Sequence, residues 1–300
     1  MYPEWQTRLI DQRTGNALTF LGEVRNGSWR TGLLHGSATE PAATVDDGIV
    51  DFVGRSIWPD DALDSFGGWA GVERLLAANW NKGIPAEWFT AATREALTGE
   101  LGLIVELAAG PGGGNLPWLL RLSPQARVLV NDIERRIVAG WQRFLAGGAG
   151  PNASFAVFDG LLPPLRDGAV DWVSTAAGFS EMSGGDDDPS AVSAKREQAV
   201  RQAFRILRPG GRLVAVETIL GLPGGQQMPV PAVTAPLGQV LLGQRPWDET
   251  LTRAGFIVDR CELVFSRLLG ADESDLQAEA DRYSMQLETR MYAIEARKPA

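Results

Sequence analysis

The sequence predicts an α/β fold built on a doubly wound, mostly parallel β-sheet. An apolar run at residues 103–107 has the composition of a buried strand, and a glycine-rich turn and a helix-like segment at residues 115–122 follow it. Three further strand-like runs recur downstream, at residues 127–131, 154–158 and 171–175. Strands that alternate with helices in this way are typical of a parallel sheet covered on both faces.

A helix that starts at about residue 192 is expected to end at Arg208. Pro209 blocks its continuation, and Gly210 and Gly211 allow the chain to reverse into another β-rich run. After that run, residues 221–238 are rich in proline and glycine, so we expect an irregular loop there. Long loops at the carboxyl edge of a parallel sheet commonly serve a binding site, and we interpret this one as a lid over the substrate.

The turn after the first strand combines an acidic residue, Glu106, with small residues at Ala108, Gly110 and Gly112. Glycine permits positive φ angles and close approach of a ligand to the backbone, and the following helix points its N-terminus at the turn. A dinucleotide fingerprint would need glycine at the sixth position of G-x-G-x-x-G. Counting from Gly110 that position is Asn115, and counting from Gly112 it is Pro117, so a nicotinamide site is not predicted.

The segment from Glu106 to Gly112, with the sequence ELAAGPG, resembles the first motif of the class I S-adenosylmethionine-dependent methyltransferases. That motif has the form D/E-h-G-x-G-x-G, where h is apolar, and Ala108 replaces its first glycine. The resemblance implies a Rossmann-like methyltransferase fold with a seven-stranded sheet. It also implies S-adenosylmethionine as cofactor, S-adenosylhomocysteine as product, and cofactor contacts at Glu106, Ala108, Gly110 and Gly112.

The resemblance extends to the ends of the next strands. It assigns Asp132, which ends the second strand, to the ribose hydroxyl groups and Ile133 to one face of the adenine. Asp132 could instead cap the helix expected at residues 134–146, and both roles are compatible. After the third strand it assigns Asp159 to the adenine amino group, with the backbone of Gly160 or Leu161 beside it. An Asx-turn is the alternative for Asp159.

Two later segments also resemble the family. Residues 205–217, RILRPGGRLVAVE, are similar to its L-K-P-G-G-x-L turn into the fifth strand, and residues 175–181 follow the fourth strand, where Ala176 is expected to contact the cofactor. Residues 175–181 are similar to the corresponding stretch of quinone-biosynthesis C-methyltransferases, except that Ser180 and Glu181 replace its Arg-Asn. The resemblance therefore implies a small, largely apolar acceptor.

The chain is expected to comprise two domains. Residues 1–60 show short strand-like runs between turn signals, which predicts a small β-rich cap, and residues 61–300 form the methyltransferase domain. Within it we expect connecting helices at residues 61–100, the lid at 221–238 and an inserted helix at 271–288. A helix at 246–254 and strands at 256–264 and 290–296 would complete the sheet, the last two as an antiparallel pair.

Composition narrows the function classes. A net charge of -9 with no run of basic residues disfavours nucleic acid as a partner, because phosphate neutralisation dominates nucleic-acid affinity. One cysteine, Cys261, and one histidine, His35, give no metal-ligand set, so we expect no metal cofactor. No apolar run is long enough to cross a membrane and the first residues lack a signal sequence, so we expect a cytoplasmic protein with a small-molecule substrate.

No single catalytic base follows from the sequence. Glu181 stands where acceptor-facing residues are expected, His35 lies in the cap, and Tyr283 lies on the inserted helix. Their alternatives are a surface carboxylate, a turn histidine and a packing tyrosine. Two other functions stay open: methylation of RNA or protein, and non-catalytic binding of S-adenosylmethionine. The methylated atom, the pathway and the oligomeric state do not follow from the sequence.

Overall fold

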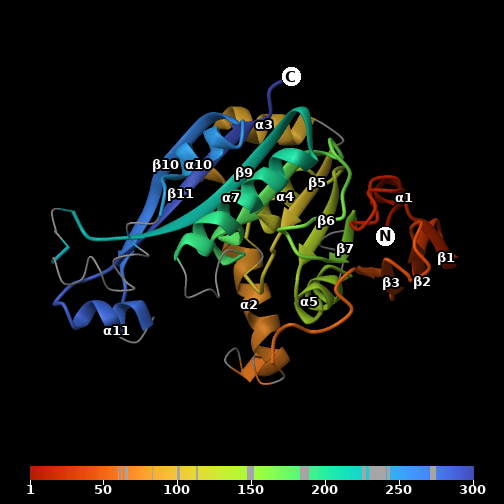
Figure 1. Cartoon of the computed structure of the whole chain (residues 1–300), viewed down its shortest axis with the longest axis horizontal. Helices are drawn as coiled ribbons and strands as arrows, with labels where there is room; N and C mark the ends of the chain where they lie inside the picture. The colour runs from red at the N-terminus through yellow and green to blue at the C-terminus, as the bar shows by residue number, and fades with distance from the viewer. Residues whose placement is uncertain are drawn as a thin grey trace.

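The computed structural model describes most of the chain, namely residues 1–59, 61, 63–64, 67–82, 84–99, 102–112, 114–146, 152–182, 189–224, 228–229, 241, 244–270 and 275–300. The strands in these residues join one 11-stranded sheet in the order β1-β2-β3-β4-β7-β6-β5-β8-β9-β11-β10. Figure 1 shows this sheet running from the N-terminal strands at one end of the molecule to β10 and β11 at the other. The predicted α/β class is therefore observed.

Parallel strands form the centre of the sheet. They pair in the order β4-β7-β6-β5-β8-β9. Their bounds are β4 (Ile49–Asp51), β5 (Leu103–Leu107), β6 (Arg127–Asp132), β7 (Ala153–Val157), β8 (Val170–Ala176) and β9 (Leu207–Gly221). Buried apolar residues fill β5 to β8, as expected for strands that are covered on both faces.

Beyond β9 the sheet continues with two antiparallel strands. β11 (Glu288–Arg297) pairs with β9, and β10 (Ile257–Leu268) pairs with β11 at the edge. The strands β7-β6-β5-β8-β9-β11-β10 thus supply the seven expected from the sequence, including the antiparallel pair at the end.

The prediction of a seven-stranded sheet is nevertheless wrong in its total, because the N-terminal strands extend the same sheet. β1 (Thr19–Arg25), β2 (Ser28–His35), β3 (Ala43–Asp46) and β4 follow one another in antiparallel pairs. β4 then pairs with β7, whose edge would otherwise present unpaired backbone groups. The β-rich character was predicted, but strands β2 and β3 were not. The domain boundary near residue 60 stays a prediction, and residue 60 lies outside the described residues.

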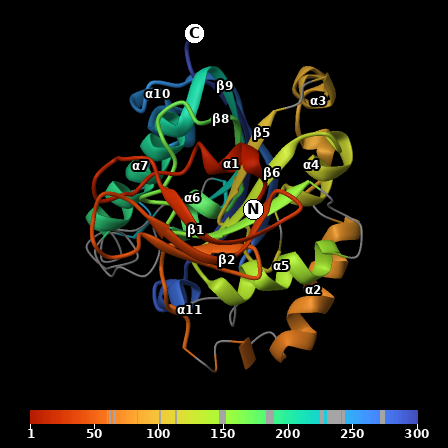
Figure 2. The same ribbon diagram turned by 90° about the vertical axis from the view of Figure 1, so that its right-hand side faces the viewer.

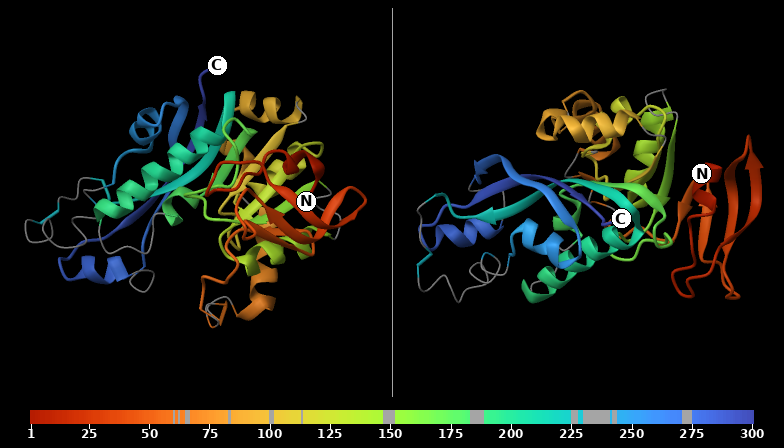
Figure 3. Two further views of the ribbon diagram at one scale, coloured as in Figure 1. Left: turned by 45° about the vertical axis from the view of Figure 1, so that its right-hand side comes forward. Right: turned by 90° about the horizontal axis from the view of Figure 1, so that it is seen from above.

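Helices cover both faces of the sheet, as Figures 2 and 3 show. One face carries α2 (Gly68–Lys82), α3 (Ala91–Gly99), α4 (Leu116–Leu122) and α5 (Arg135–Ala146). The other carries α6 (Gly178–Glu181), α7 (Pro189–Ile206) and α10 (Trp247–Arg253). Each face has its own apolar core, with Trp118 and Trp141 in the first and Trp247 and Phe179 in the second. A short helix, α1 (Pro3–Gln6), buries Trp5 near the N-terminal strands.

Two predicted insertions differ from the structure. The helix expected at residues 271–288 is observed only as α11 (Asp275–Asp281), because Ser284 adopts a left-handed φ of 56° and the chain then continues into β11. Residues 271–274 lie outside the described residues. Of the predicted lid at residues 221–238, only 221–224 and 228–229 are described, and Gly221 still belongs to β9.

Candidate functional site

The turn after β5 places several residues in the left-handed backbone region, as its glycines allow, although Gly112 is not one of them. Ala108, Gly110 and Gly114 have positive φ angles of 51°, 55° and 44°. At Gly114 a Cβ atom would lie 2.7 Å from the Cβ of Ala176 and 2.9 Å from Oε1 of Glu106. The turn therefore packs its backbone directly against the end of β8, and only glycine fits at residue 114.

Glu106 lies beneath this turn and is fully buried. Its Oε1 accepts a hydrogen bond from the backbone N–H of Asn115 at 3.2 Å, whereas Oε2 has no hydrogen-bond partner among the residues that the structure describes. Burial raises the pKa of Glu106 to about 8, although hydrogen bonds from Ser174 and Asn115 oppose the shift. A buried acceptor without a donor is rare in folded proteins, and it matches a site that awaits a cationic or donating group.

Asp132 at the end of β6 ties the turn to the second strand. Its Oδ2 accepts from the N–H of Gly110 at 2.9 Å, and Oδ1 accepts from the N–H of Glu134 at 2.9 Å. The second of these bonds satisfies the backbone N–H of Glu134, the residue just before α5, which begins at Arg135. It therefore resembles the helix-capping role considered from the sequence. Asp132 is only 6% exposed, and burial raises its pKa above the usual value.

Residues 56–58 of the N-terminal segment are held beside Asp132 by its neighbour Glu134. Oε2 of Glu134 accepts from the Ser56 hydroxyl at 2.8 Å and from the N–H groups of Ile57 and Trp58 at 3.2 and 3.1 Å. Burial alone would raise the pKa of Glu134, but hydrogen bonds from Arg136, Ser56 and Trp58 lower it to about 2. This contact between the N-terminal segment and the end of β6 was not predicted from the sequence.

Asp159, which follows β7, forms an Asx-turn, the alternative to adenine binding that was considered from the sequence. Its Oδ1 accepts from the N–H of Leu161 at 2.8 Å. Gly160 is buried under Met182, since an added Cβ would lie 2.2 Å from the Met182 sulfur. The carboxylates of Glu106, Asp132 and Asp159 thus stand at the ends of three adjacent parallel strands, as predicted.

A cavity of about 390 Å³ opens at this edge of the sheet. Its lining consists of Asn79, Ile84, Pro85, Trp88, Ala108, Ala109, Gly110, Gly112, Gly114, Ala176, Ala177, Glu181 and Met291. Five residues predicted from the sequence are among them: Ala108, Gly110, Gly112, Ala176 and Glu181. Six predicted cofactor residues are not: Glu106, Ile133, Asp132, Asp159, Gly160 and Leu161. For these six, a contact with a ligand stays a prediction.

Of the three candidate bases, only Glu181 lies at the cavity. His35 ends β2, and β3, β4, β7 and β6 separate that strand from β5. Tyr283 packs against a small apolar cluster around Leu269 and Met285, as its alternative reading held. The structure therefore places neither His35 nor Tyr283 on the lining of this cavity.

Glu181 reaches the cavity from the short helix α6, whose first turn is held by Glu217. Oε1 of Glu217 accepts from the N–H of Phe179 at 2.9 Å, and Oε2 accepts from the N–H and the hydroxyl of Ser180 at 3.1 and 2.9 Å. Glu217 is fully buried, and burial raises its pKa to about 7. The sequence placed Glu217 in a strand but indicated no role for it.

Residues from distant segments complete the cavity. Asn79 comes from α2, Ile84, Pro85 and Trp88 come from the connection that contains the 3₁₀ helix Ala86–Trp88, and Met291 comes from β11. Connecting helices were expected at residues 61–100, but the sequence marked no residue in them as part of the site. Nothing in the sequence marked Met291 as a site residue, because a single methionine in a strand is usually a packing residue.

Ala108 supplies a test of the turn itself. A left-handed conformation costs a residue with a side chain roughly 1–2 kcal/mol, and glycine avoids that cost while adding flexibility to the unfolded chain. We therefore expect Ala108→Gly to raise the free energy of unfolding by up to about 1 kcal/mol. Urea unfolding monitored by circular dichroism measures this change. Ala254→Gly is the matched control, because Ala254 has a φ of -79°, where glycine relieves no strain, and this variant should lose stability. A clear loss of stability in Ala108→Gly would contradict the assigned turn conformation.

Among the described residues that line the cavity, Glu181 alone carries a charge. Within the described ranges, no group of three or more His, Cys, Asp or Glu side chains is arranged to hold a metal ion, and the metal-free reaction stays a prediction. None of the helices in the described part of the chain combines the length and apolar character that crossing a membrane requires.

The chain was compared with known proteins. Residues 105–215 match the family model described as a methyltransferase domain. The chain is 33% identical over 146 residues to a demethylmenaquinone methyltransferase of Thermus thermophilus, covering 49% of this chain and 59% of that protein. It is 29% identical over 115 residues to a ubiquinone/menaquinone biosynthesis C-methyltransferase of Hahella chejuensis, covering 38% and 42%.

These alignments span about half the length of the relatives. Among solved structures, a SAM-dependent methyltransferase from Aquifex aeolicus is 16% identical, with a TM-score of 0.44, and the match covers 75% of this chain and 97% of that one.

Proposed function

We propose that the protein, whose residues 105–215 match a methyltransferase domain model, transfers a methyl group from S-adenosylmethionine to a small, largely apolar metabolite. One observation carries this proposal: the glycine-rich turn after β5 and the end of β8 open onto one cavity at the carboxyl edge of the parallel strands. In open α/β sheets, ligands bind at this edge.

The residues present fit S-adenosylmethionine. Ala108, Gly110 and Gly112 offer backbone without bulky side chains, and Glu106 offers a buried acceptor behind Gly114. We assign the amino-acid part of the cofactor to this turn and Ala176, and its adenosine part to Asp132, Ile133, Asp159, Gly160 and Leu161 at the ends of β6 and β7. When bound, the cofactor supplies an electrophilic methyl group. We propose no metal for this chemistry.

The side chains that line the cavity support an apolar methyl acceptor. Ile84, Pro85, Trp88 and Met291 present apolar surface, and none of the lining residues that the structure describes is cationic. An apolar acceptor body would exclude water and stay oriented toward the methyl group, and such positioning can supply ~7–11 kcal/mol of barrier reduction. The names of the curated relatives, which refer to quinone biosynthesis, also support a small apolar acceptor.

Binding and turnover can be tested separately. Titration calorimetry with S-adenosylmethionine tests the cofactor site, and formation of S-adenosylhomocysteine with a panel of quinols, phenols and aromatic amines tests transfer. Binding and transfer to a member of the panel would support the proposal. Binding without transfer to that panel, together with transfer to RNA or protein, would instead favour a macromolecular acceptor. Absence of binding would overturn the proposed cofactor.

We propose Glu181 as the group that accepts a proton from the acceptor. Glu181→Gln keeps the shape of the side chain but removes its basicity, so turnover should fall by about 10²–10⁴-fold while the affinity for S-adenosylmethionine stays unchanged. The assay uses the panel member on which the wild type is most active. Glu249→Gln, at an exposed glutamate that pairs with Arg245, is the matched control. Equal turnover in Glu181→Gln and the control would reject this role.

A further inference from the structure

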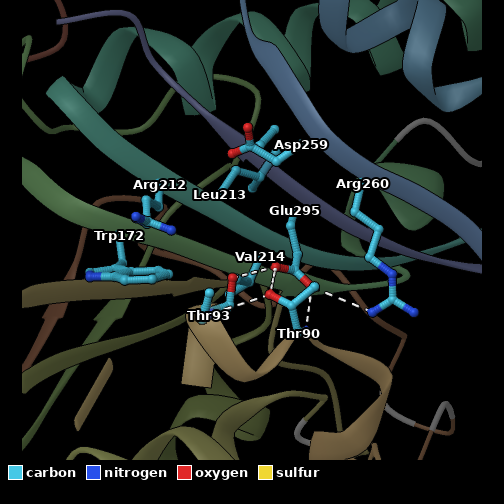
Figure 4. A pocket seen from close by; sticks show the side chains of 11 residues that line it. Thr90, Thr93, Trp172, Arg212, Leu213, Val214, Asp259, Arg260 and Glu295 are labelled. Atoms are coloured by element: carbon cyan, nitrogen blue, oxygen red, sulfur yellow. Dashed lines mark hydrogen bonds and ion pairs between the residues drawn. The ribbon is translucent and has the colours of Figure 1, made fainter. Parts of the chain in front are cut away.

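Glu295 is a buried carboxylate in β11, which lies between β9 and β10 in the sheet. Only 4% exposed, it accepts from the N–H of Thr90 at 2.6 Å and from the hydroxyl of Thr90 at 2.6 Å. The hydroxyl of Thr93 donates to the same carboxylate. Figure 4 shows these side chains converging on Glu295 from the start of α3.

Arg260 of β10 adds a second connection to the same segment. Its Nη1 lies 3.4 Å from Oε1 of Glu295 and also donates to the backbone carbonyl of Trp88. Burial by itself would raise the pKa of Glu295, but hydrogen bonds from Thr90, Thr93 and Arg260 hold it below the usual value. At neutral pH this carboxylate is therefore ionised, and all its donors come from Arg260 and the start of α3.

The segment before α3 and strand β11 meet at Glu295, and both also contribute residues to the wall of the cofactor cavity. The segment that ends at Thr90 contributes Ile84, Pro85 and Trp88, and β11 contributes Met291. Met291 and Glu295 are four residues apart on one strand, so their side chains lie on the same face of the sheet. Any shift of Thr90 relative to Glu295 would therefore move Trp88 relative to Met291.

We propose that Glu295 is a positioning residue which, with Thr90, Thr93 and Arg260, holds the wall formed by Ile84, Pro85 and Trp88 against the cofactor cavity. This inference rests on the proposed function, because it gives the wall proposed to face the acceptor a second role, that of enclosing the cofactor bound in the same cavity. Glu295 itself does not line that cavity. It acts through the segment that it anchors, in the way that supporting contacts orient the residues of a binding site.

Two variants weaken the anchor. In Glu295→Gln an amide NH₂ group replaces one of the two carboxylate oxygens. Because that group donates and does not accept, at least one hydrogen bond from Thr90 or Thr93 is lost. Thr93→Val removes one hydroxyl while keeping the side-chain shape. Asp259→Asn is the matched control. Asp259 and Glu295 line one pocket (Figure 4), but Asp259 pairs with the exposed Arg297.

Titration calorimetry with S-adenosylhomocysteine, at a temperature where circular dichroism shows every variant folded, gives the first readout. We expect about tenfold weaker binding for Glu295→Gln, a smaller loss for Thr93→Val and no change for Asp259→Asn. Hydrogen exchange should become faster at residues 84–99 in the first two variants. In a Trp88→Ala background, Glu295→Gln should cause little further loss, because the wall that it positions is already incomplete.

The outcomes separate the two proposals. Wild-type protein that binds no S-adenosylhomocysteine would overturn the proposed function, and the anchoring role with it. Normal wild-type binding with unchanged affinity in both Glu295→Gln and Thr93→Val would overturn the anchoring role alone. Full additivity of Glu295→Gln and Trp88→Ala would do the same, because it would show that Glu295 acts independently of Trp88. If Glu295→Gln does not fold, the affinity of Thr93→Val for S-adenosylhomocysteine still tests the anchoring role.

Discussion

Replacement of Asp132 by alanine is expected to weaken the binding of S-adenosylmethionine by about 10- to 100-fold. Hydrogen bonds to a charged group are worth about 1.5–3 kcal/mol, and each 1.4 kcal/mol changes affinity tenfold. The loss has two sources in this structure, because Asp132 also holds the N–H of Gly110 and so fixes the turn that lines the cavity. Titration calorimetry measures the affinity.

A ligand without the 2′-hydroxyl separates the ribose contact from the support of the turn. If Asp132 binds the ribose, wild-type protein should prefer S-adenosylhomocysteine to its 2′-deoxy analogue, and Asp132→Ala should lose most of that preference. Asp167→Ala is the control, since Asp167 is highly exposed and pairs with Arg205. An equal preference in wild type and Asp132→Ala would leave Asp132 only its contacts with Gly110 and Glu134.

The centre of the fold could be predicted because its signals are local. Strands β5 to β8 are short apolar runs that end at turn residues. Proline disfavours continuation of a helix, and α7 ends at Ile206, before the predicted Arg208, so that Pro209, Gly210 and Gly211 lie within β9. The order of the strands along the chain then leaves few arrangements for a parallel sheet. Backbone conformation in the glycine-rich turn followed from the same local chemistry, including the positive φ at Gly110.

The N-terminal strands and the far walls of the cavity depend on contacts between distant segments. β4 is only Ile49–Asp51, and its place in the sheet is set by pairing with β7, whose edge no local pattern identifies as free. Trp88 and Met291 both line the cavity, and their spacing in the sequence carries no information about that placement. The three acids were placed correctly at strand ends, but their degree of burial was not foreseen.

Burial makes Glu106 the residue whose replacement should have opposite effects on stability and on binding. Its pKa is raised from 4.5 to about 8, so between these values the folded protein retains a proton that the unfolded chain releases. The free energy of unfolding of the ligand-free protein therefore falls as pH rises through this window. Glu106→Gln removes the titration, and we expect it to be more stable than wild type at pH 8. Urea unfolding at pH 5 and pH 8 measures the difference.

The same variant should bind S-adenosylmethionine more weakly, by about one to two orders of magnitude, because a neutral amide cannot balance the ammonium group of the ligand. In wild type at pH 7, an ammonium group near Glu106 would lower the carboxyl pKa, and binding would release a proton that Glu106→Gln does not release. Calorimetry in buffers of different ionisation enthalpy counts this proton, with Glu249→Gln as control. Equal proton release by wild type and Glu106→Gln would show that the buried carboxylate does not sense the ligand, and its role would then be limited to holding the turn through Asn115.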